Sequence, residues 1–198
     1  MEPRRPPEYH LEIAADRQSI RDVVKGILHT IFFHRYFTPL IPSTHEILDQ
    51  TLPYVSSEEV ESLILKQTQL LLRHLDAASS SSGAQTSPTS RPRGQLVVQF
   101  LEKKRRKGWF VAKADEETVW ENWVIDVTLT TARSEPEAVR NRRLMERGLE
   151  KAAMKIVGIV NRERGHIPPI TTNESNPFPY NILVNPKEGG WGKGMGIF

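Results

Sequence analysis

The chain has 198 residues, of which 38% are hydrophobic and 26% are charged, and its net charge is +3. This length and composition indicate one globular domain with a hydrophobic core of its own. The absence of cysteine excludes disulfide frameworks, thiolate zinc sites and cysteine nucleophiles, and no apolar run approaches the roughly 20 residues of a membrane span. We therefore expect a protein of the cytosol or the nucleus.

Two regular elements are predicted at the amino-terminal end. Residues 9–13 alternate between apolar and polar side chains, which predicts a half-buried strand that ends near Asp16. Residues 20–32 then carry apolar side chains at the three-four spacing of an amphipathic helix, with Asp16 or Ser19 available as its cap. The prolines in residues 37–55 predict an irregular segment or short edge strands.

A second helix is predicted after Ser56, which forms a capping box with Glu59 and precedes an apolar stripe that ends at Leu75. Residues 79–94 are rich in serine and proline and bury too little apolar surface to offset the entropy lost on ordering. They are therefore predicted to be a disordered insertion. The glycine-rich residues 186–198 are predicted to form a flexible tail.

The remaining elements complete an α+β domain. Residues 96–101 and 123–130 predict the two strands of an antiparallel hairpin. A long helix is expected from a capping box at Ser134 to Gly165, followed by a last strand over residues 180–184. This order predicts three helices packed on a largely antiparallel sheet.

Trp109 and Phe110 lie side by side in the long connection between the two hairpin strands. Each ring can bury roughly 150–250 Å² on a partner, so an outward-facing pair would be a protein-binding loop tip; alternatively, the rings fold back onto the core. Five cations precede the pair, namely Lys103, Lys104, Arg105, Arg106 and Lys107. This basic run is either a solvated face, a signal for nuclear import, or a contact for an anionic membrane or nucleic acid. No specific nucleic acid is expected, because no further aromatic residues are interleaved with the run.

Catalytic, cofactor and metal sites are not predicted. The sequence lacks the serine elbow, the zinc-protease motif and the dinucleotide fingerprint. His29 and His34 are five residues apart, and no carboxylate lies at the spacing of a further metal ligand. Trp120 and Trp123 are expected to belong to the core rather than to a site. The third helix has a basic face that either solvates it or meets an acidic partner. This face comprises Arg140, Arg142, Arg143, Arg147, Lys151 and Lys155, of which Arg140, Arg143, Arg147 and Lys151 are the candidates for such a contact.

Several short motifs follow one another between residues 28 and 162. They are Leu28-His29-Thr30 with His34-Arg35, Tyr54-Val55-Ser56-Ser57-Glu58-Glu59, Phe100-Leu101-Glu102-Lys103-Lys104, Trp109-Phe110, Trp120-Glu121-Asn122-Trp123 and Val160-Asn161-Arg162. Their order and spacing closely resemble the autophagy-related protein 101 family.

The resemblance implies one HORMA domain over residues 8–185 and a non-enzymatic role without cofactors. Family members pair with the HORMA domain of autophagy-related protein 13 and stabilise it. They thereby support the autophagy-initiating kinase complex at the phagophore assembly site. An exposed Trp-Phe finger in the family recruits downstream autophagy factors, and it falls here on Trp109 and Phe110. The basic face of the third helix is then the candidate contact for the partner HORMA domain.

Overall fold

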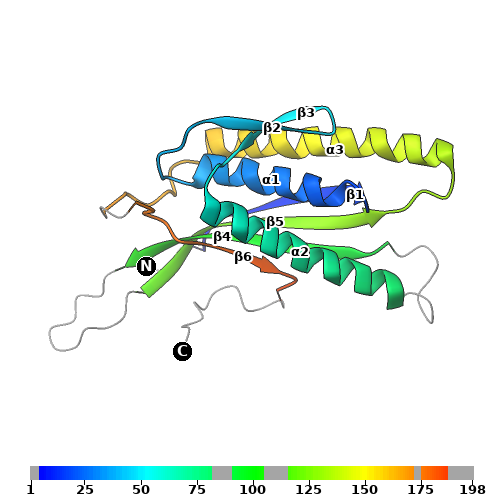
Figure 1. Cartoon of the computed structure of the whole chain (residues 1–198). Helices are drawn as coiled ribbons and strands as arrows, with labels where there is room; N and C mark the ends of the chain where they lie inside the picture. Colours follow the sequence, from blue (N-terminus) through cyan, green and yellow to red (C-terminus); the bar gives the residue numbers. More distant parts are fainter. Residues whose placement is uncertain (1–4, 82–90, 105–115, 172–174, 187–198) are drawn as a thin grey trace.

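The computed structural model describes residues 5–81, 91–104, 116–171 and 175–186. The described chain is an α+β domain with its three helices gathered over one sheet (Figure 1). Its elements, in chain order, are β1 (Glu8–Asp16), α1 (Ile20–Arg35), β2 (Ser43–Ile47), β3 (Gln50–Tyr54), α2 (Glu58–Ser81), β4 (Arg93–Lys104), β5 (Glu116–Thr130), α3 (Glu135–Arg162) and β6 (Tyr180–Val184).

The main sheet has four strands in the order β1-β5-β4-β6. The central pair, β4 and β5, is the antiparallel hairpin that the sequence predicts, and β6 adds to β4 antiparallel. The first strand, β1, runs parallel to β5 at the other edge. The predicted architecture of three helices on a largely antiparallel sheet is therefore confirmed, and it is consistent with a HORMA-like fold.

The core lies between the helices and the sheet face that they cover. Strand residues of one parity point into it, because successive side chains of a strand alternate between its two faces. Phe32 of α1 and Phe100 of β4 are fully buried there, with ring centroids 5.6 Å apart. Trp120 is 7% exposed and Trp123 is fully buried, which confirms the prediction that both belong to the core.

The segment between α1 and α2 folds as a separate two-stranded hairpin, β2 with β3, which lies against α1 (Figure 1). The prediction of short strands between residues 37 and 55 is confirmed. Leu48 and Asp49 form the turn with φ angles of 49° and 62°, in the left-handed region that two-residue hairpin turns require. Gly26 makes room for the hairpin, because a Cβ atom there would stand 2.7 Å from Ile47 and 2.9 Å from Leu52.

The second helix begins later than the predicted capping box requires. Its first intrahelical bond runs from the Glu61 N–H to the Ser57 carbonyl, which makes Ser57 the residue that flanks the helix. Three residues after Ser57 the chain has Val60, which cannot return a hydrogen bond. The predicted box of Ser56 and Glu59 is therefore wrong in register.

The third helix begins at Glu135, as its capping signal predicts, but the predicted capping box of Ser134 and Glu137 does not form. Ser134 makes no side-chain cap bond, whereas the Glu137 carboxylate accepts a 2.8 Å hydrogen bond from the backbone N–H of Arg133. The helix ends at Arg162, three residues before the predicted stop at Gly165.

The predicted insertion over residues 79–94 is regular at both of its ends. The α2 helix continues to Ser81, and β4 starts at Arg93. Hydrogen bonds from the Ser79 and Ser80 hydroxyls to the carbonyls four residues earlier satisfy these polar side chains within the helix. Residues 82–90 and almost all of the predicted tail lie outside the described residues.

Candidate interaction surfaces

The predicted finger belongs to the connection between β4 and β5. The last described pairs of this hairpin are Lys103 with Glu117 and Lys104 with Glu116, so both strand ends lie together at one end of the sheet. Trp109 and Phe110 lie outside the described residues. The finger stays a prediction, and the described hairpin fixes only the position from which the connection starts.

The predicted basic run lies only partly within the described residues. Lys103 is exposed at the end of β4, and Lys104 is the last residue of that strand. Arg105, Arg106 and Lys107 lie outside the described part of the chain. The structure therefore does not test whether these five cations act as one surface.

The outer face of α3 brings together the four cations proposed for the partner contact. Met145, Leu149 and Ile156 form the buried side of the helix. With 3.6 residues in each turn, the four cations occupy the opposite side, and all of them are exposed. They are Arg140, Arg143, Arg147 and Lys151, and we call them, together with the helix surface between them, the α3 basic stripe.

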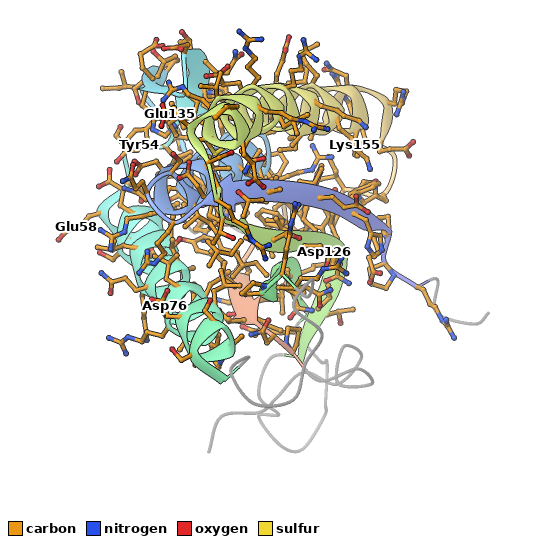
Figure 2. The ribbon with its side chains drawn as sticks, turned by 90° about the vertical axis from the view of Figure 1, so that its right-hand side faces the viewer. Tyr54, Glu58, Asp76, Asp126, Glu135 and Lys155 are labelled. Atoms are coloured by element: carbon orange, nitrogen blue, oxygen red, sulfur yellow. The ribbon has the colours of Figure 1, made fainter. Side chains whose placement is uncertain are left out.

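The cations of the α3 basic stripe make no ion pair with any described residue. Two neighbouring cations of the same helix are engaged instead. Arg142 contacts Glu146 at 2.9 Å and Asp49 at 3.8 Å. The ammonium of Lys155, labelled on α3 in Figure 2, donates to the His10 carbonyl at 2.7 Å. The stripe thus carries positive charge that the described domain does not neutralise.

Large apolar side chains lie along the same surface. Leu144 is 55% exposed and Met154 is 65% exposed, while Val139 is 48% exposed near the start of the helix. Apolar side chains bordered by unpaired charge are usual where one protein binds another. The surface as a whole suits a partner that offers acidic groups around an apolar centre.

A polar cluster lies inside the domain at the end of α1. The Glu121 carboxylate is fully buried and accepts hydrogen bonds from Arg35 at 2.9 and 3.0 Å and from the Trp123 indole at 2.6 Å. The imidazole Nε2 of His166 stands 2.7 Å from the other carboxylate oxygen, and Arg35 also donates to the Glu163 carbonyl at 3.0 Å. The cluster ties α1, β5 and the turn after α3 together.

A β-bulge produces this arrangement. The register of β4 against β5 shifts between Phe100 and Leu101, so Trp120 is an extra residue on β5. As a result both Trp120 and Glu121 face His166, with a ring-centroid distance of 5.7 Å for the first and the 2.7 Å contact for the second. A regular strand would have turned one of these side chains to the opposite face.

Sequence reasoning assigned no role to this cluster. Arg35, Glu121 and Trp123 all belong to the motifs that carry the family resemblance, and they meet in space although they come from distant parts of the chain. One signal was available: Glu121 has the same parity as Trp123, which places an acidic side chain at an inward position. The neighbouring Tyr9 has its pKa raised to about 12, by burial first and then by the Glu121 charge.

His29, the buried histidine of α1, has a structural role. The His29 ring stacks on Tyr54 at 4.2 Å, and its Nδ1 accepts a 3.3 Å hydrogen bond from the Val55 N–H. Burial, followed by the proximity of His45 and Lys25, lowers the pKa of His29 to about 3, which keeps the ring neutral. Within the described ranges there is no group of three or more potential metal ligands, and no helix could cross a membrane.

Comparisons with a family model and with individual proteins agree on one family. The profile of a family described as Autophagy-related protein 101 matches residues 12–174. The autophagy-related protein 101 of Schizosaccharomyces pombe is 29% identical over 185 residues, which cover 92% of this chain and 89% of the relative. The Arabidopsis thaliana protein of the same name is 24% identical over 208 aligned positions, covering 94% and 90% of the two chains.

Proposed function

The chain belongs to the autophagy-related protein 101 family, and from its membership we propose that it acts in autophagy as a non-enzymatic scaffold. Its partner is the HORMA domain of autophagy-related protein 13, within the autophagy-initiating kinase complex at the phagophore assembly site in the cytoplasm. The family match over most of the chain is the observation that carries this proposal.

The α3 basic stripe is the proposed contact for the partner HORMA domain. Its cations have no ionic partner among the described residues, and exposed Leu144 and Met154 supply apolar area beside them. A specific heterodimer buries about 1,600 Å² in total, which a 28-residue helix can provide only in part. The stripe is therefore one portion of a larger docking surface.

Stabilisation of the partner follows from mass action. A protein that binds only the folded form of its partner stabilises that form by about 2.7 kcal/mol when its free concentration is a hundredfold above Kd. Mixing the full chain with the partner HORMA domain should therefore shift both to an earlier elution volume and raise the partner's Tm. Unchanged elution together with an unchanged Tm would contradict heterodimer formation.

Charge reversal tests the position of the contact. The double change Arg143→Glu and Arg147→Glu should weaken the heterodimer by tenfold or more, since close charge pairs across interfaces contribute about 1.5 kcal/mol or more. The matched control is Lys66→Glu with Arg73→Glu, two exposed cations on α2. Equal weakening by both pairs would show a dependence on net charge rather than on the α3 basic stripe.

The finger has a separate proposed role, the recruitment of downstream autophagy factors through Trp109 and Phe110. Replacing both residues with alanine should leave the Tm of the isolated chain and heterodimer formation nearly unchanged, while the recruited factors disappear from material co-purified from cells. Each ring can contribute a few kcal/mol to binding through its apolar area. A large loss of Tm in the isolated chain would assign the rings to the core instead.

Salt separates this role from the rival use of the basic run. Binding to nucleic acid through cations falls steeply between low and moderate salt, because counterions are released, whereas an apolar finger contact responds weakly. A contact between Lys103–Lys107 and an anionic membrane would likewise weaken with salt. Binding of recruited factors that resists salt supports the finger.

A further inference from the structure

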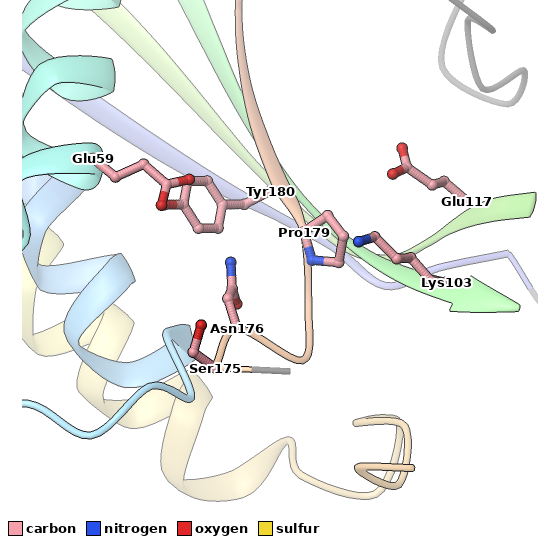
Figure 3. A pocket seen from close by; sticks show the side chains of 7 residues that line it. All are labelled: Glu59, Lys103, Glu117, Ser175, Asn176, Pro179 and Tyr180. Carbon is pink, nitrogen blue, oxygen red and sulfur yellow. The ribbon is translucent and has the colours of Figure 1, made fainter. Parts of the chain in front are cut away.

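A polar hollow of about 550 Å³ lies where α2 begins, at the ends of β4 and β5 and beside the segment that leads into β6. Figure 3 shows Glu59 on one side of it, next to the ring of Tyr180, and Glu117 on the other side. Ser175 and Asn176 point into the space from the segment before β6. The α3 basic stripe contributes no residue to its wall.

The wall carries two carboxylates. Neither Glu59 nor Glu117 makes an ion pair with any residue of the described chain, although Glu59 interacts with the Tyr180 hydroxyl. Glu58 and Glu61 add negative charge in the same first turn of α2. Lys103 also lines the hollow, but one ammonium against two carboxylates leaves the wall net negative.

Tyr180 provides an aromatic feature of the wall. Its hydroxyl is buried beside the Glu59 carboxylate, which interacts with it as a hydrogen-bond acceptor, although no described group meets the strict distance and angle of a hydrogen bond. Burial raises the pKa of this phenol, and the nearby Glu59 carboxylate raises it further, so the hydroxyl stays protonated. The oxygen can still accept a hydrogen bond, and the ring face can bind a cation.

We propose that this hollow binds the guanidinium group of an arginine side chain that a peptide segment of a partner protein presents. The group would pair with Glu59 and stack beside Tyr180, while Glu117 attracts it at the other side. Arginine fits better than lysine because its planar head both stacks on aromatic rings and donates in a fork to carboxylates. A metal ion is disfavoured, since no cluster of three ligands occurs among the described residues.

This proposal does not depend on the heterodimer or on the finger. The hollow is separate from the α3 basic stripe, and every wall residue used here is a described residue outside 105–115. A variant that loses arginine binding should still form the heterodimer, so the two proposals can fail independently.

The test is a titration of the isotope-labelled full chain, followed by NMR, with the peptide acetyl-Gly-Arg-Gly-amide. The matched control peptide carries citrulline, which has the same shape without the charge. We expect saturable shifts of the Asn176 and Tyr180 amides with the arginine peptide, weaker shifts with a lysine peptide, and none with citrulline. Equal binding of citrulline or lysine, or no saturable shift at millimolar peptide, would overturn the proposal.

Substitutions locate the binding group. Glu59→Gln should weaken the arginine peptide about fivefold and Glu117→Gln about twofold, as exposed charge pairs contribute up to about 1 kcal/mol. Tyr180→Phe should keep most of the affinity, because the ring face remains. Glu150→Gln on α3 is the matched control and should have no effect. If Glu59→Gln bound the peptide as tightly as the unchanged protein, the hollow would not be the site.

Discussion

At the scale of single residues, Glu121 is the side chain on which most of the polar interior depends. Moving a carboxylate from water into the core costs several kcal/mol, which only close donors can offset. Arg35, Trp123 and His166 supply those donors, each within 3.0 Å. Removing one partner of such a group therefore leaves the other buried and uncompensated.

We predict that Glu121→Gln lowers the free energy of unfolding by about 3–5 kcal/mol, because the Arg35 guanidinium stays buried without its counter-charge. The measurement is urea unfolding followed by circular dichroism. Replacing both partners, with Arg35→Met and Glu121→Leu, should cost less than the single change, since no charge then remains in the core.

The control is Glu146→Gln, which removes an exposed partner of Arg142 at a similar distance of 2.9 Å. Exposed pairs of this kind contribute at most about 1 kcal/mol. If the Glu121 and Glu146 variants lost the same stability, the buried cluster would contribute no more than a surface ion pair. If the double variant Arg35→Met with Glu121→Leu were less stable than Glu121→Gln, the buried and uncompensated charge of Arg35 would not be the cause of the loss.

At the scale of elements, the contact between the β2–β3 hairpin and α1 depends on a glycine. Glycine in a helix interior costs about 0.5–1 kcal/mol relative to alanine, so Gly26 is retained at a local cost. The cost is offset by the close approach of Ile47 and Leu52 to the helix backbone. The hairpin and α1 therefore share one packing constraint.

Comparing two glycines tests this constraint. Gly148→Ala on α3 should raise the free energy of unfolding by about 0.5–1 kcal/mol, because nothing lies within 4 Å of the added methyl group. Gly26→Ala should give no gain or a loss, since its Cβ would meet Ile47 at 2.7 Å. Thermal unfolding of both variants measures these changes. If both variants gained the same free energy of unfolding, the β2–β3 hairpin would be able to shift away from the added methyl group without cost.

At the scale of the whole molecule, the sequence predicts the helices and strands well, but it predicts poorly which strands lie next to one another in the sheet. Periods of two and of three to four residues indicate the three helices and most of the strands, because they reflect the face that each element buries. Strand pairing across distant segments leaves no local pattern. The parallel placement of β1 beside β5 could therefore not be predicted from alternation over residues 9–13.

The buried cluster escaped prediction for a related reason. A bulge inserts one residue and changes which side chains face the core, and nothing in the period of β5 signals that Trp120 is the extra residue. The partners of Glu121 come from α1 and from the turn after α3, which only the folded chain brings together. By contrast, the outer face of α3 could be predicted, because a helix fixes the relative positions of its own residues.

The response of the whole domain to acid follows from three histidines. Burial lowers the pKa of His29 to about 3 and also lowers the pKa of His34 and of His45 below the ordinary 6.5. Well above pH 6.5 neither the folded nor the unfolded chain binds these protons, so the histidines add no pH dependence there. Below pH 6.5 the three histidines become protonated in the unfolded chain but stay neutral in the folded chain. The free energy of unfolding must therefore fall as the pH is lowered.

For His29 alone, the free energy of unfolding should drop by roughly 2 kcal/mol between pH 6.5 and about pH 5, at about 1.4 kcal/mol per pH unit. The matched variant is His29→Asn, whose side-chain oxygen can accept the Val55 N–H in place of Nδ1. The variant is less stable at neutral pH. Its free energy of unfolding should nevertheless fall less steeply between these pH values, by the slope that corresponds to the uptake of one proton. Urea unfolding at several pH values measures both slopes. If the two slopes were equal, the buried imidazole would not be what makes the fold sensitive to acid.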